Sequence, residues 1–196
     1  IFCLFSCASV NERHLEEAVS NGEMLFQEKR YSEAMTVCSE AEQMARQLDD
    51  QFCLGKIYRI MAHISNAAYR YQDEIQYLKM ASDAFHNAEK PYNRLYVDME
   101  KGMAYYNVSD YASAEKVYRD VLYRAYEVSD TALQAQCLSA YAALSLEVSR
   151  PDPSLAIDML SRVANDLKYP LSSADRGVLA YAYSLSGNDD EALKWA

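Results

Sequence analysis

The side chains that could carry out chemistry are few and scattered along this chain. The three histidines, His14, His63 and His86, lie far apart, and none has a second histidine four residues away, so their spacing predicts no metal site. The five glycines are isolated, which leaves no phosphate-binding loop, and no G-x-S-x-G sequence offers a serine nucleophile. Acidic neighbours such as Asp49 and Asp50 would diverge by about 100° on a helix, so they form no acid–base pair. The sequence therefore predicts no enzyme and no cofactor.

The cysteines give no sign of a redox or metal motif. Beyond the first seven residues the chain has Cys38, Cys53 and Cys137, none of them in a C-x-x-C pair, and their odd number leaves at least one thiol unpaired. Cys38 and Cys137 fall on apolar helix faces, so we expect them to be small buried hydrophobic residues.

Charge excludes one class of partner. The chain carries 29 acidic and 19 basic residues, a formal net charge of −10, whereas binding to nucleic acid requires clustered Lys and Arg. The excess is greatest at the amino-terminal end, since residues 1–50 hold ten Asp and Glu against four Lys and Arg. We expect a protein or peptide partner and no nucleic acid.

The first ten residues differ from the rest. The segment IFCLFSC is apolar but too short to cross a membrane as a helix. Its last four residues, Leu4 to Cys7, resemble the end of a bacterial lipoprotein signal, in which the cysteine becomes the lipidated first residue; Phe5 and Ser6 depart from the two small residues of the commoner form. The alternative is the frayed start of a core helix.

This resemblance implies two regions and a location. Residues 1–10 would be the end of a signal and a tether, and residues 11–196 a helical array. A lipid on Cys7 would anchor the protein in a bacterial cell envelope, facing the periplasm. Without that signal a cytoplasmic location is expected.

An internal repeat organises residues 11–196. The sequences YSEA, YQDE and YASA begin at Tyr31, Tyr71 and Tyr111, and this constant spacing is a period of about 40 residues, typical of stacked helix pairs that cannot bury their apolar faces alone. Small residues recur nine positions before and ten positions after these tyrosines, where neighbouring helices need a close approach: Gly22, Ala62 and Gly102 before, and Ala41, Ala81 and Val121 after.

The apolar spacing predicts helices rather than strands. In Ser32 to Leu48 apolar residues recur at steps of three and four, which indicates one long helix with Ser32 as its cap. A fourth unit follows, with a break at Pro151 and Pro153, and a fifth begins near Ala174. Because the chain ends within a predicted helix, we expect a further carboxy-terminal part.

The stretch from Tyr96 to Ser129, YVDMEKGMAYYNVSDYASAEKVYRDVLYRAYEVS, resembles a tetratricopeptide (TPR) repeat. Gly102 precedes Tyr105 in the first helix, and Tyr111 and Ala114 open the second, as in that family. The resemblance implies an all-α, right-handed α-solenoid of about four and a half helix hairpins. The family's usual unit is shorter, about 34 residues, so the longer period of this chain predicts longer helices.

The TPR resemblance also implies a concave groove that binds a peptide segment or a partner domain. The family's groove positions correspond here to Glu23, Phe26, Gln27, Arg59, His63, Asn66, Met99, Met103, Tyr106, Asn107, Ala143 and Tyr181. Such a groove would be acidic at one end and lined by Met and Tyr in its middle. The paired Lys and Asn with which some relatives hold a terminal carboxylate are absent, since Val19 and Glu23 occupy those positions in the first unit.

Three functions follow from these resemblances. The first is a lipid-tethered scaffold that binds protein partners. The second is the sensor half of an envelope signalling or transcription-regulatory protein whose membrane and output parts lie beyond residue 196. The third is a glycan-uptake lipoprotein, although that class needs aromatic sugar platforms and Trp195 is the only tryptophan.

Overall fold

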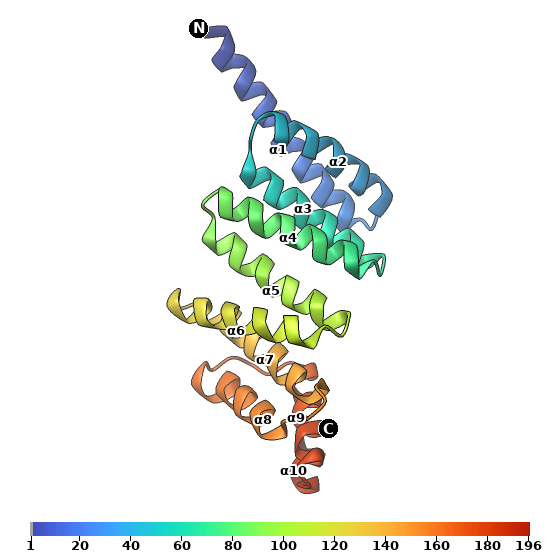
Figure 1. The fold of residues 1–196 in the computed structure, drawn as a ribbon, viewed down its shortest axis with the longest axis vertical. Helices are drawn as coiled ribbons and strands as arrows, with labels where there is room; N and C mark the ends of the chain where they lie inside the picture. Colours follow the sequence, from blue (N-terminus) through green and yellow to red (C-terminus); the bar gives the residue numbers. More distant parts are fainter. Residues whose placement is uncertain (1) are drawn as a thin grey trace. The chain divides into compact units, whose positions relative to one another are not determined.

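The computed structural model describes the backbone of residues 2–196 and the side chains of residues 10–196 (Figure 1). This part of the chain forms α-helices and one π-helical turn and contains no strand, so the all-α prediction is confirmed. The elements in order are α1 (Phe2–Gln27), α2 (Tyr31–Gln47), α3 (Gln51–Ala67), α4 (Tyr71–Asn87), α5 (Pro91–Asn107), α6 (Tyr111–Glu127), α7 (Thr131–Glu147), α8 (Pro153–Ser161), η1 (Arg162–Asp166), α9 (Ser173–Leu185) and α10 (Asp189–Trp195). None of the described helices is long and apolar enough to cross a membrane.

The helices α2 to α7 repeat with a constant length. Each has 17 residues, and turns of three residues join the successive helices from α1 to α7. A hairpin therefore takes about 40 residues, and its surplus over the usual unit of about 34 residues lies in the helices, as the period predicts. Within each compact unit the short turns make consecutive helices run antiparallel.

The turns share one backbone geometry. The middle residue of each has a positive φ of 53–61°, at Lys29, Asp49, Tyr69, Glu89, Ser109 and Ser129. After α4, for example, Lys90 N–H donates to Phe85 C=O at 2.9 Å and Glu89 N–H donates to His86 C=O at 3.0 Å. This is the Schellman ending of a helix, which satisfies the last carbonyl groups. Glycine usually occupies the left-handed position, and none of these six positions is a glycine, so the sequence carried no glycine signal for this turn geometry.

The residue after each left-handed position precedes the next helix, and in three turns it caps that helix. Asp50, Asp110 and Asp130 accept a hydrogen bond from the backbone N–H three residues later, at 2.9–3.1 Å. Before α2 this position is Arg30, which makes no such side-chain bond. The prediction that Ser32 caps α2 is therefore wrong: the preceding turn starts the helix at Tyr31, so Ser32 lies inside its first turn.

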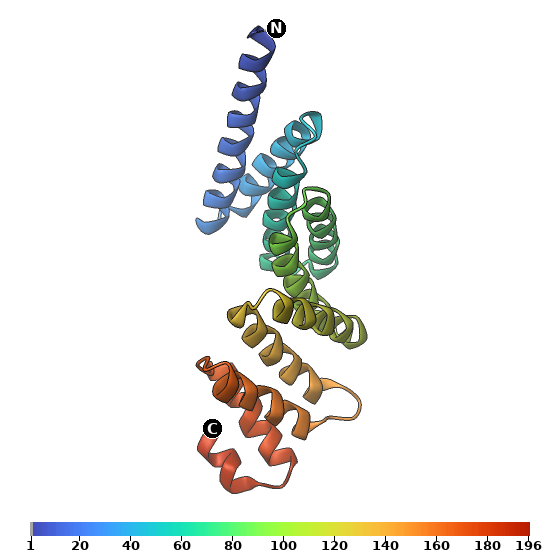
Figure 2. The ribbon, with the colours of Figure 1, turned by 90° about the vertical axis from the view of Figure 1, so that its left-hand side faces the viewer.

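The first compact unit, Ile1–Ala104, holds α1 to α4 and most of α5. Helix α1 packs on α2 and α3, and α3 packs on α4, side by side in both views (Figure 1, Figure 2). The predicted close approach at Gly22 is present, because a Cβ built there would lie 2.9 Å from Cys38 Sγ. Gly55 similarly lies under the Phe85 ring, which a Cβ would meet at 2.6 Å.

The second compact unit, Tyr105–Ala196, has its core between α7, α8, η1 and α9. Leu138, Ala142 and Leu160 are fully buried there. The predicted break at the prolines is present, since α7 ends at Glu147 and α8 begins at Pro153. Ala114, which the repeat places at the entry to α6, is also fully buried, as the register requires.

The non-glycine left-handed residues make a testable prediction. We expect Glu89→Gly to be more stable than Glu89→Ala by about 1 kcal/mol, because alanine keeps the Cβ that is disfavoured at a φ of 55°. Glu89 is exposed, so both variants remove the same surface charge. Urea unfolding followed by circular dichroism measures the difference.

The same two substitutions at Asp83, within α4, give the control. Asp83 is exposed in the middle of the helix, and there Gly should be less stable than Ala by about 1 kcal/mol. Equal stabilities of the two Glu89 variants would contradict the backbone argument.

Candidate functional site

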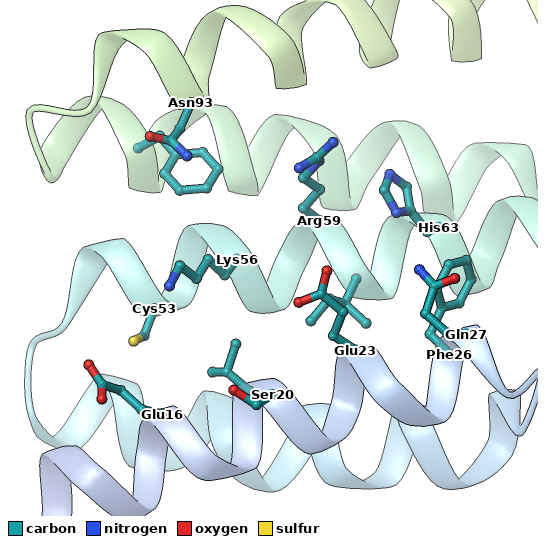
Figure 3. Close-up of a pocket in the computed structure, with 13 residues that line it drawn as sticks. Glu16, Ser20, Glu23, Phe26, Gln27, Cys53, Lys56, Arg59, His63 and Asn93 are labelled. Carbon is teal, nitrogen blue, oxygen red and sulfur yellow. The ribbon is translucent and has the colours of Figure 1, made fainter.

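A cavity of about 600 Å³ opens on one side of the first unit (Figure 3). Its walls are α1 and α3, with one residue each from α4 and α5. The lining residues are Glu16, Val19, Ser20, Glu23, Phe26, Gln27, Cys53, Lys56, Arg59, Ile60, His63, Phe85 and Asn93. We call this cavity the α1–α3 groove. Its volume falls within the range of about 300–1,000 Å³ that is common for binding pockets.

The spacing of residues along α1 explains how one face of this helix lines the groove while another is buried in the core. Glu16, Ser20, Glu23 and Gln27 follow one another at steps of four, three and four, which places them on one face of the helix. They project from α1 into the groove in Figure 3. Leu15, Gly22 and Leu25 are buried instead.

The opposite wall follows the same rule on α3. Lys56, Arg59 and His63 recur there at steps of three and four, so they share one face of that helix. The groove thus lies between two helix faces that the sequence spacing defines.

Arg59 and His63 bind the same carboxylate on α5. Arg59 Nε donates to both carboxylate oxygens of Glu100 at 3.0 Å, and Nη2 donates to Oε1 at 2.5 Å. His63 Nε2 lies 3.2 Å from Glu100 Oε2. Burial alone would raise the pKa of Glu100, but the bonds from His63 and Arg59 outweigh it and hold that pKa below the ordinary value. These three side chains tie α3 to α5 beside the groove.

A second carboxylate near this cluster behaves in the opposite way. Glu74 on α4 is buried and accepts hydrogen bonds from Asn66 Nδ2 at 2.9 and 3.0 Å. Burial raises the pKa of Glu74, and its Asn66 partner is neutral rather than cationic. On the α1 side the Phe26 ring packs against His63, with centroids 5.7 Å apart. The end of the groove is thus an ordered polar network with one aromatic wall.

Five predicted contact residues meet in this groove. Glu23, Phe26 and Gln27 come from α1, and Arg59 and His63 come from α3. The TPR-derived positions therefore identified one continuous surface in the first unit. Whether that surface binds a partner stays a prediction.

The other predicted residues of the first unit have different surroundings. Asn66 is half-buried and holds Glu74, while Met103 is 51 % exposed on α5. Met99 is only 4 % exposed on α5, next to the buried Val97 and Asp98, and it does not line the α1–α3 groove. Its role in partner contact stays a prediction.

The remaining predicted residues lie in the second unit. Tyr106 is half-buried with its ring centroid 5.7 Å from that of Tyr111, and Asn107 ends α5 exposed. Ala143 is half-buried on α7, and Tyr181 is 51 % exposed on α9. Their role in binding stays a prediction.

Sequence reasoning missed several residues of the site. Glu16, Ser20 and Lys56 share helical faces with predicted residues, so the same spacing could have found them. Asn93 and Glu100 carried no such signal, because they lie on a third helix and reach the site only through packing.

The cysteine thiols are poorly suited to chemistry. Burial raises the pKa of Cys38 to about 11 and, with a smaller effect of Asp50, that of Cys53 to about 12. Cys38 and Cys137 are 1 % and 0 % exposed, which confirms them as buried small residues. Within the described residues no group of three or more His, Cys, Asp or Glu could hold a metal ion. Cys7 belongs to α1, but its side chain lies outside the described residues.

Comparison with known proteins identifies the fold. No family model matches the sequence, and no curated protein matches it. Two crystal structures from Podospora anserina are similar, a predicted kinesin light chain with nearly identical TPR-like repeats and a variant of it. Each is 18 % identical to this chain and has a TM-score of 0.70. The alignment covers 93 % of this chain and 91 % of the other.

The fold is therefore a TPR-like α-solenoid. At 18 % identity the likeness shows the fold and carries no partner across.

The Glu100 cluster gives a prediction with a defined pH dependence. The pKa of the Glu100 carboxyl group is lower in the folded protein than the ordinary 4.5. The carboxylate therefore contributes its full stabilisation of the fold above pH 4.5, and that contribution is lost as the pH falls through the folded pKa. We expect Glu100→Gln to cost about 1–2 kcal/mol at pH 7, and the deficit to shrink as the pH falls below 4.5. Urea unfolding at a series of pH values measures both effects.

Glu40→Gln on the exposed face of α2 is the control for loss of charge. It should change stability by less than about 0.5 kcal/mol at any of these pH values. A pH-independent deficit in Glu100→Gln would contradict the ion-pair argument.

Proposed function

We propose that this protein is a binding scaffold and that the α1–α3 groove receives a segment of a partner protein. The observation that supports this most directly is the groove itself, which gathers five predicted contact residues into one cavity of about 600 Å³. A scaffold requires no reacting group, and the ordered side chains beside the groove act as structural ties: Arg59 and His63 contact Glu100, and Phe26 packs on the His63 ring.

Rigidity of the walls also supports a binding role. Arg59, His63 and Glu100 hold α3 against α5, and Phe26 packs on the His63 ring. A surface that is ordered before its partner arrives loses less conformational entropy on binding. The groove combines an apolar base, which includes Val19 and Ile60, with polar side chains at its edges, as is usual at protein interfaces.

Filling the groove tests this proposal. Ser20 is small, exposed and part of the lining, so Ser20→Trp should occupy the cavity without disturbing the buried core. Peptides selected on the unmodified chain from a displayed random library should lose at least about tenfold in affinity for Ser20→Trp, since truncating or blocking a central contact costs about 1–2 kcal/mol or more.

Gln43→Trp on the exposed face of α2 is the matched control and should bind the same peptides normally. Isothermal titration calorimetry gives the affinities, and circular dichroism confirms the fold of both variants. Equal binding by Ser20→Trp and the unmodified chain would place the binding surface elsewhere.

We also propose that a lipid on Cys7 tethers the protein to a bacterial envelope. The support is the resemblance of Leu4 to Cys7 to a lipoprotein signal. Helix α1 spans Cys7, so a lipid there would hold the first helix hairpin close to the membrane surface.

Labelling of the full reading frame with a fatty acid in a bacterial host tests the tether. Cys7→Ser should abolish incorporation of labelled palmitate and release the protein from the membrane fraction, whereas Cys3→Ser should retain both. Label that persists in Cys7→Ser would contradict the tether and leave the groove proposal unaffected.

A further inference from the structure

Two carboxylates on the α1 side of the α1–α3 groove have no ion-pair partner in the part of the chain that the structure describes. Glu16 and Glu23 are exposed on the groove face of α1, and among the described residues neither has an ion-pair partner within 4.0 Å. They lie seven positions apart, which is two helical turns, so about 10 Å separates them along the axis. In Figure 3 both side chains extend from α1 toward the open space, and Ser20 lies between them.

The positive side chains of the groove are engaged elsewhere. Arg59 donates to both oxygens of Glu100, and Glu23 acts on Arg59 only as the weakest of the effects that raise its pKa. His63 contacts the same Glu100 carboxylate, and the ammonium of Lys56 lies over an aromatic ring, 4.4 Å from its centroid. An anionic partner would compete with these contacts, whereas a cationic partner would meet carboxylates that lack an ion pair.

The carboxylates flank an apolar base. Val19, Phe26, Ile60 and Phe85 line the cavity between the two walls. A helix that carries apolar side chains three and four residues after a basic one, and a second basic residue seven positions after the first, would present all of them on one face. That spacing matches the separation of the two glutamates.

We propose that the groove is selective for an amphipathic helical segment with two basic residues seven positions apart, and that these pair with Glu16 and Glu23 around apolar anchors. This inference rests on the proposed function of the same groove and names the chemistry of its partner. A net charge of −10 favours the encounter with such a segment over long distances, in a way that salt screens.

Three labelled helical peptides test the selectivity on the full chain. Each has about 16 residues, an alanine-rich background and two central leucines, and they differ only in carrying Lys, Gln or Glu at the two flanking positions. Fluorescence anisotropy should give affinities in the order Lys, Gln, Glu. The Lys peptide should bind roughly tenfold more tightly than the Gln peptide at low salt, and raising the salt to about 0.3 M should remove most of that difference.

Paired variants locate the effect. Replacing both glutamates, Glu16→Gln with Glu23→Gln, should weaken the Lys peptide about tenfold and leave the Gln peptide nearly unchanged. The control replaces Glu12 and Glu40 by Gln; it removes the same net charge at exposed positions outside the groove and should change the Lys peptide's affinity by less than about twofold.

The outcomes separate this inference from the proposed function. If the Glu or Gln peptide binds more tightly than the Lys peptide and Ser20→Trp still blocks that binding, the preference for basic residues is overturned. The proposal that the groove is the binding site is then supported. Equal losses in the two double variants would overturn the assignment to Glu16 and Glu23. No binding by any peptide, together with library peptides that bind Ser20→Trp normally, would overturn both.

Discussion

A turn of three residues, repeated after each helix from α1 to α6, sets the spacing of the helices α1 to α7. In each turn a non-glycine residue takes a left-handed conformation while its neighbours bond back to the carbonyl groups of the helix that ends there. The conformation costs energy at each site, roughly 1–2 kcal/mol. It is retained because it reverses the chain in the shortest distance and lets the next helix begin at once, at Asp50, Asp110 and Asp130 with a side-chain cap.

Constant turns and constant helices have a structural consequence. Residues 40 positions apart occupy equivalent positions on alternate helices. A position that requires a small residue in one hairpin therefore tends to require one in the other hairpins. Ala41 and Ala81 are both fully buried at such equivalent places, and Val121 takes the same place in the second unit. Gly22 and Ala62 likewise lie where helices approach closely, although the contact at Gly22 leaves no room for a Cβ.

The groove of the first unit is distinguished from the regular helical repeat by its charged side chains. Arg59 and His63 on α3 both contact the Glu100 carboxylate on α5, one helix hairpin further along the chain. Because these groups neutralise one another, the character of the groove depends on the side chains that remain, above all the carboxylates of α1. Burial raises the pKa of Glu74, so two carboxyl groups with opposite pKa shifts, Glu74 and Glu100, lie behind the residues that line the groove.

The class of fold and the length of the hairpin could be predicted from the amino-acid sequence, because the tyrosine-led entries set the period and apolar steps of three and four indicate helices. Groove residues such as Glu23 and Arg59 came from the resemblance to the TPR family, whose groove positions fall on these residues. Only the tertiary structure decided that Glu100 meets Arg59 and His63, and that Met99 is buried. A pattern along one helix cannot specify these contacts, because they depend on the distance and rotation between helices that packing alone sets.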